Sequence, residues 1–311
     1  MRKSKKNQTI LSFTTVLILS IVVGIIVWLP QLIKHYYSLS GWITNILGLA
    51  LTLLFGTSIF LKNREIRFLK HETIFPFLFI LLFIGLSADN LALNKEYIAL
   101  TCTSLAFYRL INQSNKFSAP WHSMESMLLL SAGSIFAPIL WAFIPVFWVG
   151  LIVFNKSSFK CILSTFMGIV VPYLVAAGII YVWDLGCYIE EFLVNVDLTY
   201  TLDLPNTAFD WTTLGIFTVS TFVGISGLFK GHDDRRYIHW INNFAAIILG
   251  VSLALNIIFY GSDLNIATAY WLTFLLTYYY SNNNNLFGKT YFWLLLLVSI
   301  LMILVESFIY S

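Results

Sequence analysis

Residues 123–154 read SMESMLLLSAGSIFAPILWAFIPVFWVGLIVF, and this stretch decides how many times the chain crosses a membrane. It is apolar for about 30 residues, too long for one span, since about 20 residues cross the hydrocarbon core. Pro138 and Pro145 interrupt it, and proline removes a hydrogen bond from the helix backbone. We therefore expect a tight hairpin that turns near Ala137 and Pro138. A re-entrant hairpin, which does not cross the membrane fully, returns the chain to the same side as two full crossings do. The sequence therefore does not decide between the two.

The basic residues agree with a hairpin. Lys116 precedes it, Lys156 and Lys160 follow it, and two crossings leave all three on one side. When every apolar run is counted as a span, sixteen of the eighteen Lys and Arg residues lie on that side, all except Lys34 and Lys95. The positive-inside rule makes this side the cytoplasm. The predicted fold is all-α, a polytopic transmembrane helix bundle of about 11 spans, with the N-terminus inside and the C-terminus outside.

Composition supports a membrane protein. The chain is 59% apolar and only 11% charged, whereas soluble domains carry about 25% charged residues. We expect one integral membrane domain over residues 1–311, with membrane lipids as partners and no nucleic acid. The expected spans cover residues 10–29, 42–61, 73–86, 97–111, the two limbs of 123–154, 161–183, 211–229, 240–260, 266–280 and 291–309.

Two of these segments carry further expectations. The first run follows four basic residues but ends at Pro30 without a cleavage site, so it should remain as a span rather than be removed as a signal peptide. Residues 184–210 contain six acidic and no basic residues, as an exported loop would.

Ionisable residues are nearly absent from the middle of the spans, where they would be the strongest sign of function. Arg109 lies near a span end and can reach the headgroups. Glu125 follows Ser123, which suggests a helix cap with the carboxylate in the first turn. The candidate catalytic residues are Asp89 and Glu96. The candidate substrate-binding residues are Arg109, Glu125, Asp184, Glu190 and Glu191.

No metal site or cofactor is expected. The three cysteines are scattered without a CxxC spacing, and the five histidines lie in loops or at span ends. No HExxH, GxSxG or Walker sequence is present. The familiar intramembrane zinc protease, the hydrolase elbow and the nucleotide-driven pump are therefore excluded.

Small residues predict close packing. Gly48, Thr52 and Gly56 recur every four residues, a spacing that allows another element to approach a helix closely. Pro172, one turn after Gly168, is expected to mark a kink.

The stretch Ser131-Ala-Gly-Ser-Ile-Phe-Ala-Pro138, an aromatic-rich helix, a short basic loop and Gly168-Ile-Val-Val-Pro172-Tyr173 together resemble a family of uncharacterised polytopic inner-membrane proteins of Bacteroidetes-type bacteria. The resemblance covers about residues 90–180. It implies a multi-pass protein of the bacterial cytoplasmic (inner) membrane and brings no established activity with it.

Three functions remain open. The first is a non-catalytic component of cell-envelope assembly that binds polyprenyl-linked intermediates or envelope proteins. The second is a glycosyltransferase-like enzyme that uses polyprenyl-phosphate sugars, although such enzymes place acidic residues in the first exported loop and residues 31–41 contain none. The third is a small-molecule transporter, for which Asn45, Asn242, Asn243 and Asn256 are the candidate polar residues. We lean towards the first and against an enzyme.

Overall fold

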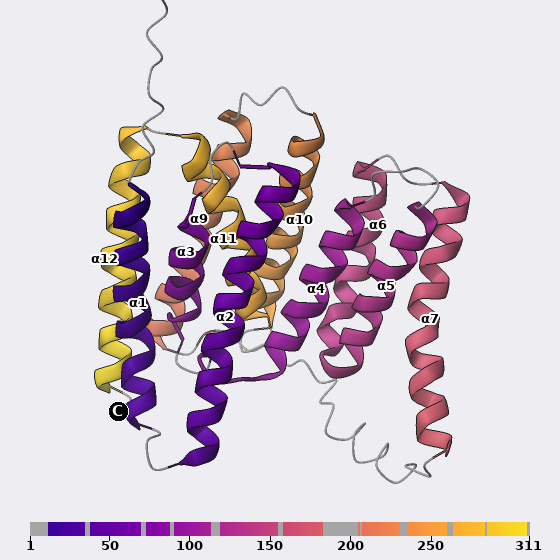
Figure 1. The fold of residues 1–311 in the computed structure, drawn as a ribbon, viewed down its shortest axis with the longest axis horizontal. Helices are drawn as coiled ribbons and strands as arrows, with labels where there is room; N and C mark the ends of the chain where they lie inside the picture. Colours follow the sequence, from indigo (N-terminus) through magenta and orange to yellow (C-terminus); the bar gives the residue numbers. More distant parts are fainter. Residues whose placement is uncertain are drawn as a thin grey trace, which may run out of the picture. The chain divides into compact units, whose positions relative to one another are not determined.

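The computed structural model describes residues 12–34, 38–69, 73–87, 90–112, 119–154, 158–182, 205, 207–230, 236–259, 264–283 and 285–309. These residues contain eleven α-helices, one short 3₁₀ helix and no strand (Figure 1). The helices are α1 (Phe13–Lys34), α2 (Leu39–Ile66), α3 (Phe75–Ile84), α4 (Lys95–Ile111), α5 (Ala119–Phe136), the 3₁₀ helix η2 (Pro138–Ala142), α6 (Phe143–Val153), α7 (Phe159–Val182), α9 (Ala208–Lys230), α10 (Arg236–Ile258), α11 (Asn265–Asn282) and α12 (Leu286–Ile309). The predicted all-α class is thus confirmed for the described residues.

Six helices are long and apolar enough to cross a membrane: α1, α2, α7, α9, α10 and α12. The other helices are shorter or more polar. At 1.5 Å per residue, α3 and α6 reach only about 15 Å, half the thickness of the hydrocarbon core. These six helices indicate a membrane protein with several spans. Eleven full crossings and their orientation stay predictions.

The chain forms two compact units. Unit 1 comprises Met1–Asn94, Asn206–Leu249 and Thr268–Ser311, and unit 2 comprises Lys95–Pro205 and Gly250–Ala267. Helices α10 and α11 therefore contribute to both units.

In unit 1, every residue of the short helix α3 except Phe77 is buried. All ten of its residues are apolar or proline, so no side of the helix needs to face water. Of the chain that follows, residues 90–94 lie against α2 and precede the next helix. There the Leu93 amide donates to the Thr44 carbonyl at 3.0 Å. Buried backbone outside a helix needs such partners, because lipid offers none.

The stripe of small residues on α2 explains this close approach. A side chain at Gly48 would place its Cβ 2.0 Å from the Leu91 carbonyl oxygen, and one at Gly56 would lie 3.0 Å from the Phe77 ring. Thr52 between them is fully buried. The predicted close packing is confirmed, and its partners are α3 and the segment that follows α3.

In unit 2, the predicted hairpin is present. Helix α5 ends at Phe136, and η2 leads into α6. Along α7, Tyr173 meets both Ser134 of α5 and Trp141 of η2, while Thr165 meets Trp148 of α6. The contacts of α5 with α7 rise together in number, from Ser131 at Gly168 to Ser134 at Tyr173, so α5 and α7 are parallel. The contacts of η2 and α6 with α7 run the other way, so α6 is antiparallel to both.

Several predicted boundaries are wrong. The expected starts at residues 211, 240 and 291 lie inside α9, α10 and α12, and three further boundaries fail for a local reason. The first span does not end at Pro30, which lies inside α1. The second span does not stop at Leu61, because α2 continues to Ile66 and carries Lys62 and Arg64 in its last turns. The carbonyl of Asn63 accepts the Arg67 amide at 2.7 Å, and its side chain accepts the Leu69 amide at 2.8 Å, so the helix is capped after its charged turn.

The third wrong boundary concerns Ser123 and Glu125. They do not open a helix, because α5 begins at Ala119 and has no acidic residue in its first turn. Pro120 lies in that first turn, where a missing backbone donor costs nothing.

Candidate functional site

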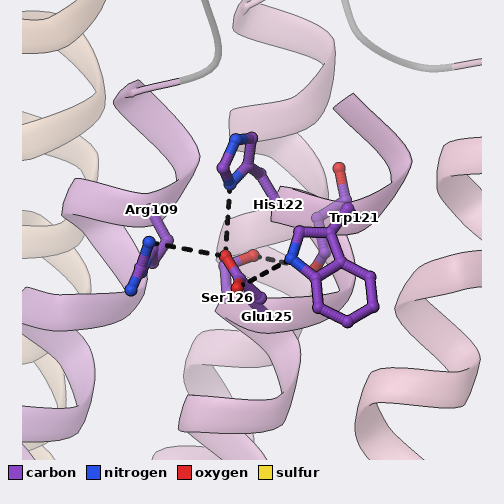
Figure 2. Close-up of polar contacts among 6 residues, drawn as sticks. Arg109, Trp121, His122, Glu125 and Ser126 are labelled. Carbon is purple, nitrogen blue, oxygen red and sulfur yellow. Dashed lines mark hydrogen bonds and ion pairs between the residues drawn. The ribbon is translucent and has the colours of Figure 1, made fainter. Parts of the chain in front are cut away.

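The structure brings together two of the predicted substrate-binding residues, Arg109 and Glu125. Arg109 lies in the last turn of α4, where a cation is favoured by the partial negative charge of a helix C-terminus. Glu125 lies in the second turn of α5 and reaches towards it (Figure 2). Helices α4 and α5 pack against each other within unit 2, so the pair sits where the end of one helix meets the start of the other.

The Glu125 carboxylate has three partners. Its Oε2 lies 3.7 Å from Nη1 of Arg109 and 3.2 Å from Nδ1 of His122. Its Oε1 accepts a hydrogen bond of 2.8 Å from Nε1 of Trp121. Trp121 and His122 precede Glu125 by four and three residues, the spacing that places side chains on one face of a helix. We call Arg109, Trp121, His122 and Glu125 the α4–α5 cluster (Figure 2).

Solvent exposure within the cluster is uneven. The side chains of Arg109 and Trp121 are 53% and 60% exposed, whereas those of His122 and Glu125 are 21% and 25% exposed. The distance of 3.7 Å makes the contact between Arg109 and Glu125 an ion pair without a hydrogen bond. A guanidinium has five N–H donors, so an exposed one can also bind an external anion.

The helix that carries the cluster is fixed by a polar interface with α7. Ser131 of α5 donates a hydrogen bond of 3.0 Å to the carbonyl of Gly168, and the hydroxyls of Ser134 and Tyr173 are hydrogen-bonded. In a helix the Gly168 carbonyl would accept from the amide of residue 172, which is proline and has none. Ser131 therefore satisfies a carbonyl that Pro172 leaves without its helical partner.

Close contact accompanies these hydrogen bonds. A Cβ at Gly168 would lie 2.4 Å from the Met124 carbonyl oxygen, and one at Gly133 would lie 2.7 Å from Cys102. The two short motifs that carry the family resemblance thus meet each other, because Ser131 and Ser134 of the first bond to Gly168 and Tyr173 of the second.

Glu96, a predicted catalytic candidate, has a contact of another kind. Its side chain is 9% exposed, and its Oε2 accepts a hydrogen bond of 2.9 Å from the amide of Ile266. Ile266 is the second residue of α11, whose first amides have no partner within the helix. A carboxylate there also interacts favourably with the helix dipole. Glu96 therefore caps α11 within unit 2.

The other candidates lie elsewhere. Asp89, Asp184, Glu190 and Glu191 fall outside the described residues. Among the transport candidates, Asn243 is exposed, and the amide groups of Asn45 and Asn242 donate to carbonyls of their own helices at 2.8 and 3.0 Å. Asn256 is buried in unit 2. The side-chain amides of Asn45 and Asn242 are thus each bonded to the backbone of their own helix.

Trp121 and His122 were not predicted as members of the cluster, and His122 was counted among the histidines in loops or at span ends. Their signal was the i, i+3, i+4 spacing to Glu125, which is visible once the helix is known to start before residue 121. Among the residues that the structure describes, no group of three or more His, Cys, Asp or Glu side chains could hold a metal ion.

Comparison with known proteins gives one match. The model of a family of unknown function, DUF6427, matches residues 5–209. The matched range contains α1 to α7 and the whole α4–α5 cluster. The chain matches no curated protein and no solved structure.

Proposed function

The chain belongs to the DUF6427 family of unknown function, and from this premise we propose that it binds a phosphate-bearing, polyprenyl-linked lipid of cell-envelope assembly without transforming it. The α4–α5 cluster carries this proposal. It offers an exposed guanidinium and an exposed indole, one on each side of the Glu125 carboxylate, in a chain with six helices apolar enough to span a membrane. Arginine binds phosphate strongly, and tryptophan favours the headgroup layer.

The proposed setting is the bacterial cytoplasmic membrane, in the Bacteroidetes-type family that the sequence resembles. The chain crosses it eleven times, with the N-terminus and the α4–α5 cluster inside and the C-terminus outside. The uneven distribution of Lys and Arg supports this orientation, because sixteen of the eighteen lie on one side of the membrane when every apolar run is counted as a span. Labelling of single cysteines introduced as Ser4→Cys and Ser311→Cys in the otherwise cysteine-free chain should find them on opposite sides of the membrane. Labelling from the same side would contradict the map.

Binding without catalysis is preferred to glycosyl transfer for a specific reason. The described acidic candidates are already engaged: Glu125 is bound to three side chains, and Glu96 caps α11. A catalytic base has to reach its substrate at hydrogen-bond distance. Glu96 is buried and already bonded to the Ile266 amide, so it is poorly placed to do so.

Binding to the purified full-length protein in nanodiscs tests the proposal, with a polyprenyl phosphate compared against the polyprenol of the same length. The phosphate should be retained and the alcohol should not. Arg109→Gln should weaken phosphate binding about tenfold, the loss expected for one charge-assisted contact. The matched control is Arg236→Gln, which removes an exposed arginine from the start of α10. Equal retention of phosphate and alcohol, or wild-type affinity in Arg109→Gln, would overturn the proposal.

A further inference from the structure

Unit 1 contains a groove that the α4–α5 cluster does not involve. It lies among α1, α2 and α3 and has a volume of about 580 Å³, within the range of about 300–1,000 Å³ typical of ligand sites. Residues from Leu17 to Leu32 of α1 form one wall, Leu49 and Leu53 of α2 form the second, and Ile74, Phe77 and Leu81 form the third. The α1 wall extends about 22 Å at 1.5 Å per residue.

The groove suits a hydrocarbon chain. Its one polar lining side chain besides the Trp28 indole is Ser20, whose hydroxyl donates to the Val16 carbonyl of its own helix at 2.8 Å. Water in such a site would find too few partners, since a buried water needs two to four. The neighbouring α1 surface is also apolar and exposed, with Ile18 at 60% and Ile33 at 65%. A membrane-facing groove with these walls favours hydrocarbon over any polar solute.

A cation lies along the groove-facing side of α2. Leu49, Leu53, Phe60 and Arg64 are separated by four, seven and four residues, which keeps them on one face of the helix. Phe60 packs on the groove residue Phe77, with ring centroids 6.4 Å apart, and the Arg64 guanidinium lies 4.9 Å from the centroid of Phe60. The line of contacts therefore runs from the groove wall to an exposed arginine.

The length of α2 puts that arginine at headgroup level. Its 28 residues span about 42 Å, against a core of about 30 Å. Lys62 on the same turns is paired with Glu65, so the local charge is mixed. Arg64 and Arg67 are both exposed and add positive charge at this end.

We infer that the groove of unit 1 holds an acyl chain of an anionic glycerophospholipid, with the lipid phosphate at Arg64. This inference does not depend on the proposed function, because it concerns other residues, another unit and a lipid of another class. Hydrocarbon in the groove supplies affinity. The arginine supplies preference for an anionic headgroup, because one basic residue near an anionic lipid surface is worth about 1 kcal/mol, roughly fivefold.

Native mass spectrometry of the full chain, delipidated in detergent and supplied with phosphatidylglycerol or phosphatidylcholine of the same acyl chains, tests this inference. The wild type should retain phosphatidylglycerol about fivefold better. Arg64→Gln should abolish the preference and keep binding of both lipids, whereas Arg236→Gln should change neither.

Filling the groove should remove both lipids. A Cβ at Gly24 would lie 3.7 Å from Leu81, so Gly24→Leu fits the backbone and sends its branch into the groove. Gly178→Leu is the control, because no atom lies within 4 Å of a Cβ there. Leu53→Trp, at a half-exposed lining residue, is a second filling variant should Gly24→Leu fail to fold.

Wild-type lipid retention in a folded filling variant would overturn the inference. So would equal retention of the two lipids by the wild type, or a lipid-free dimer as the main species. Retention of the phosphatidylglycerol preference in Arg64→Gln would also overturn it. Loss of polyprenyl phosphate binding in Arg109→Gln bears on the proposed function alone.

Discussion

The helices around α3 and the pair α5–α7 are held together by different means. Around α3, the rings of Phe75, Phe79, Phe83, Tyr280 and Phe292 stack or meet edge to face within unit 1. Between α5 and α7, serine hydroxyls and close backbone contact replace large rings. Lipid tails are as apolar as these side chains, so helix association in a membrane relies on packing and on hydrogen bonds. The comparison teaches that one chain uses both solutions, with rings dominant around α3 and hydroxyls with close backbone contact dominant between α5 and α7, although α2 in unit 1 also allows close approach at Gly48 and Gly56.

The ring cluster is expected to give the largest effect. Phe79 is 1% exposed, and its ring lies 5.4 Å from that of Tyr280. Phe79→Ala should lower the free energy of unfolding by about 4 kcal/mol, because it removes a buried ring and leaves a cavity. Unfolding by SDS titration in bicelles measures this change. Leu54→Ala, at an exposed position of α2, should cost about 0.5 kcal/mol or less. Equal losses would mean that the rings do not hold α3.

Close approach of α5 and α7 should matter almost as much. Gly168→Leu would force the helices apart, because even its Cβ would meet the Met124 backbone. We expect a loss of about 3 kcal/mol in the same assay. Gly178→Leu on the same helix should stay near the wild type, and comparable behaviour of the two variants would contradict the close contact.

The hydrogen bond that replaces the proline amide should give a smaller and conditional effect. Ser131→Ala should cost about 1 kcal/mol, because the Gly168 carbonyl loses its donor. Pro172→Ala restores an amide that can donate to the same carbonyl. Ser131→Ala should therefore cost less in the Pro172→Ala background, by about 0.5 kcal/mol or more. Strict additivity of the two substitutions would show that Ser131 does not compensate for the proline.

The smallest effect on stability is expected at the α4–α5 cluster. Glu125→Gln removes an ion pair that is partly exposed, so the free energy of unfolding should change by about 0.5 kcal/mol or less. Binding of a polyprenyl phosphate should become tighter, because a negative charge next to Arg109 is gone while an oxygen acceptor for Trp121 remains. Weaker binding would mean that Glu125 mainly positions the arginine.

Much of the fold could be predicted from sequence, for identifiable reasons. Each expected span overlaps one α-helix, and the turn at Ala137 and Pro138 is correct because proline both ends α5 and opens η2. Predicted helix boundaries were wrong where a helix continues into polar residues, because hydropathy marks the end of the apolar run and not the end of the helix. Lys62 and Arg64 are polar enough to look like loop, yet α2 continues through them to its C-cap at Arg67, whose amide donates to the carbonyl of Asn63.

The candidate site was predicted only in part. Arg109 and Glu125 were chosen separately as ionisable residues near span ends, and no local pattern says that α4 and α5 bring them together. Glu96 was chosen for its charge, whereas its role at Ile266 depends on a contact across 170 residues of sequence. Long-range contacts of this kind carry no signal in hydropathy or spacing.

The most direct test of the central claim is photo-crosslinking of the full-length protein in membranes with a polyprenyl phosphate that carries a photoreactive group beside the phosphate. The account predicts that the cross-linked peptides contain the end of α4 and the start of α5, and that Arg109→Gln removes them while Arg236→Gln does not. Cross-links confined to other helices, or unchanged by Arg109→Gln, would contradict the assignment of the α4–α5 cluster as a phosphate-binding site.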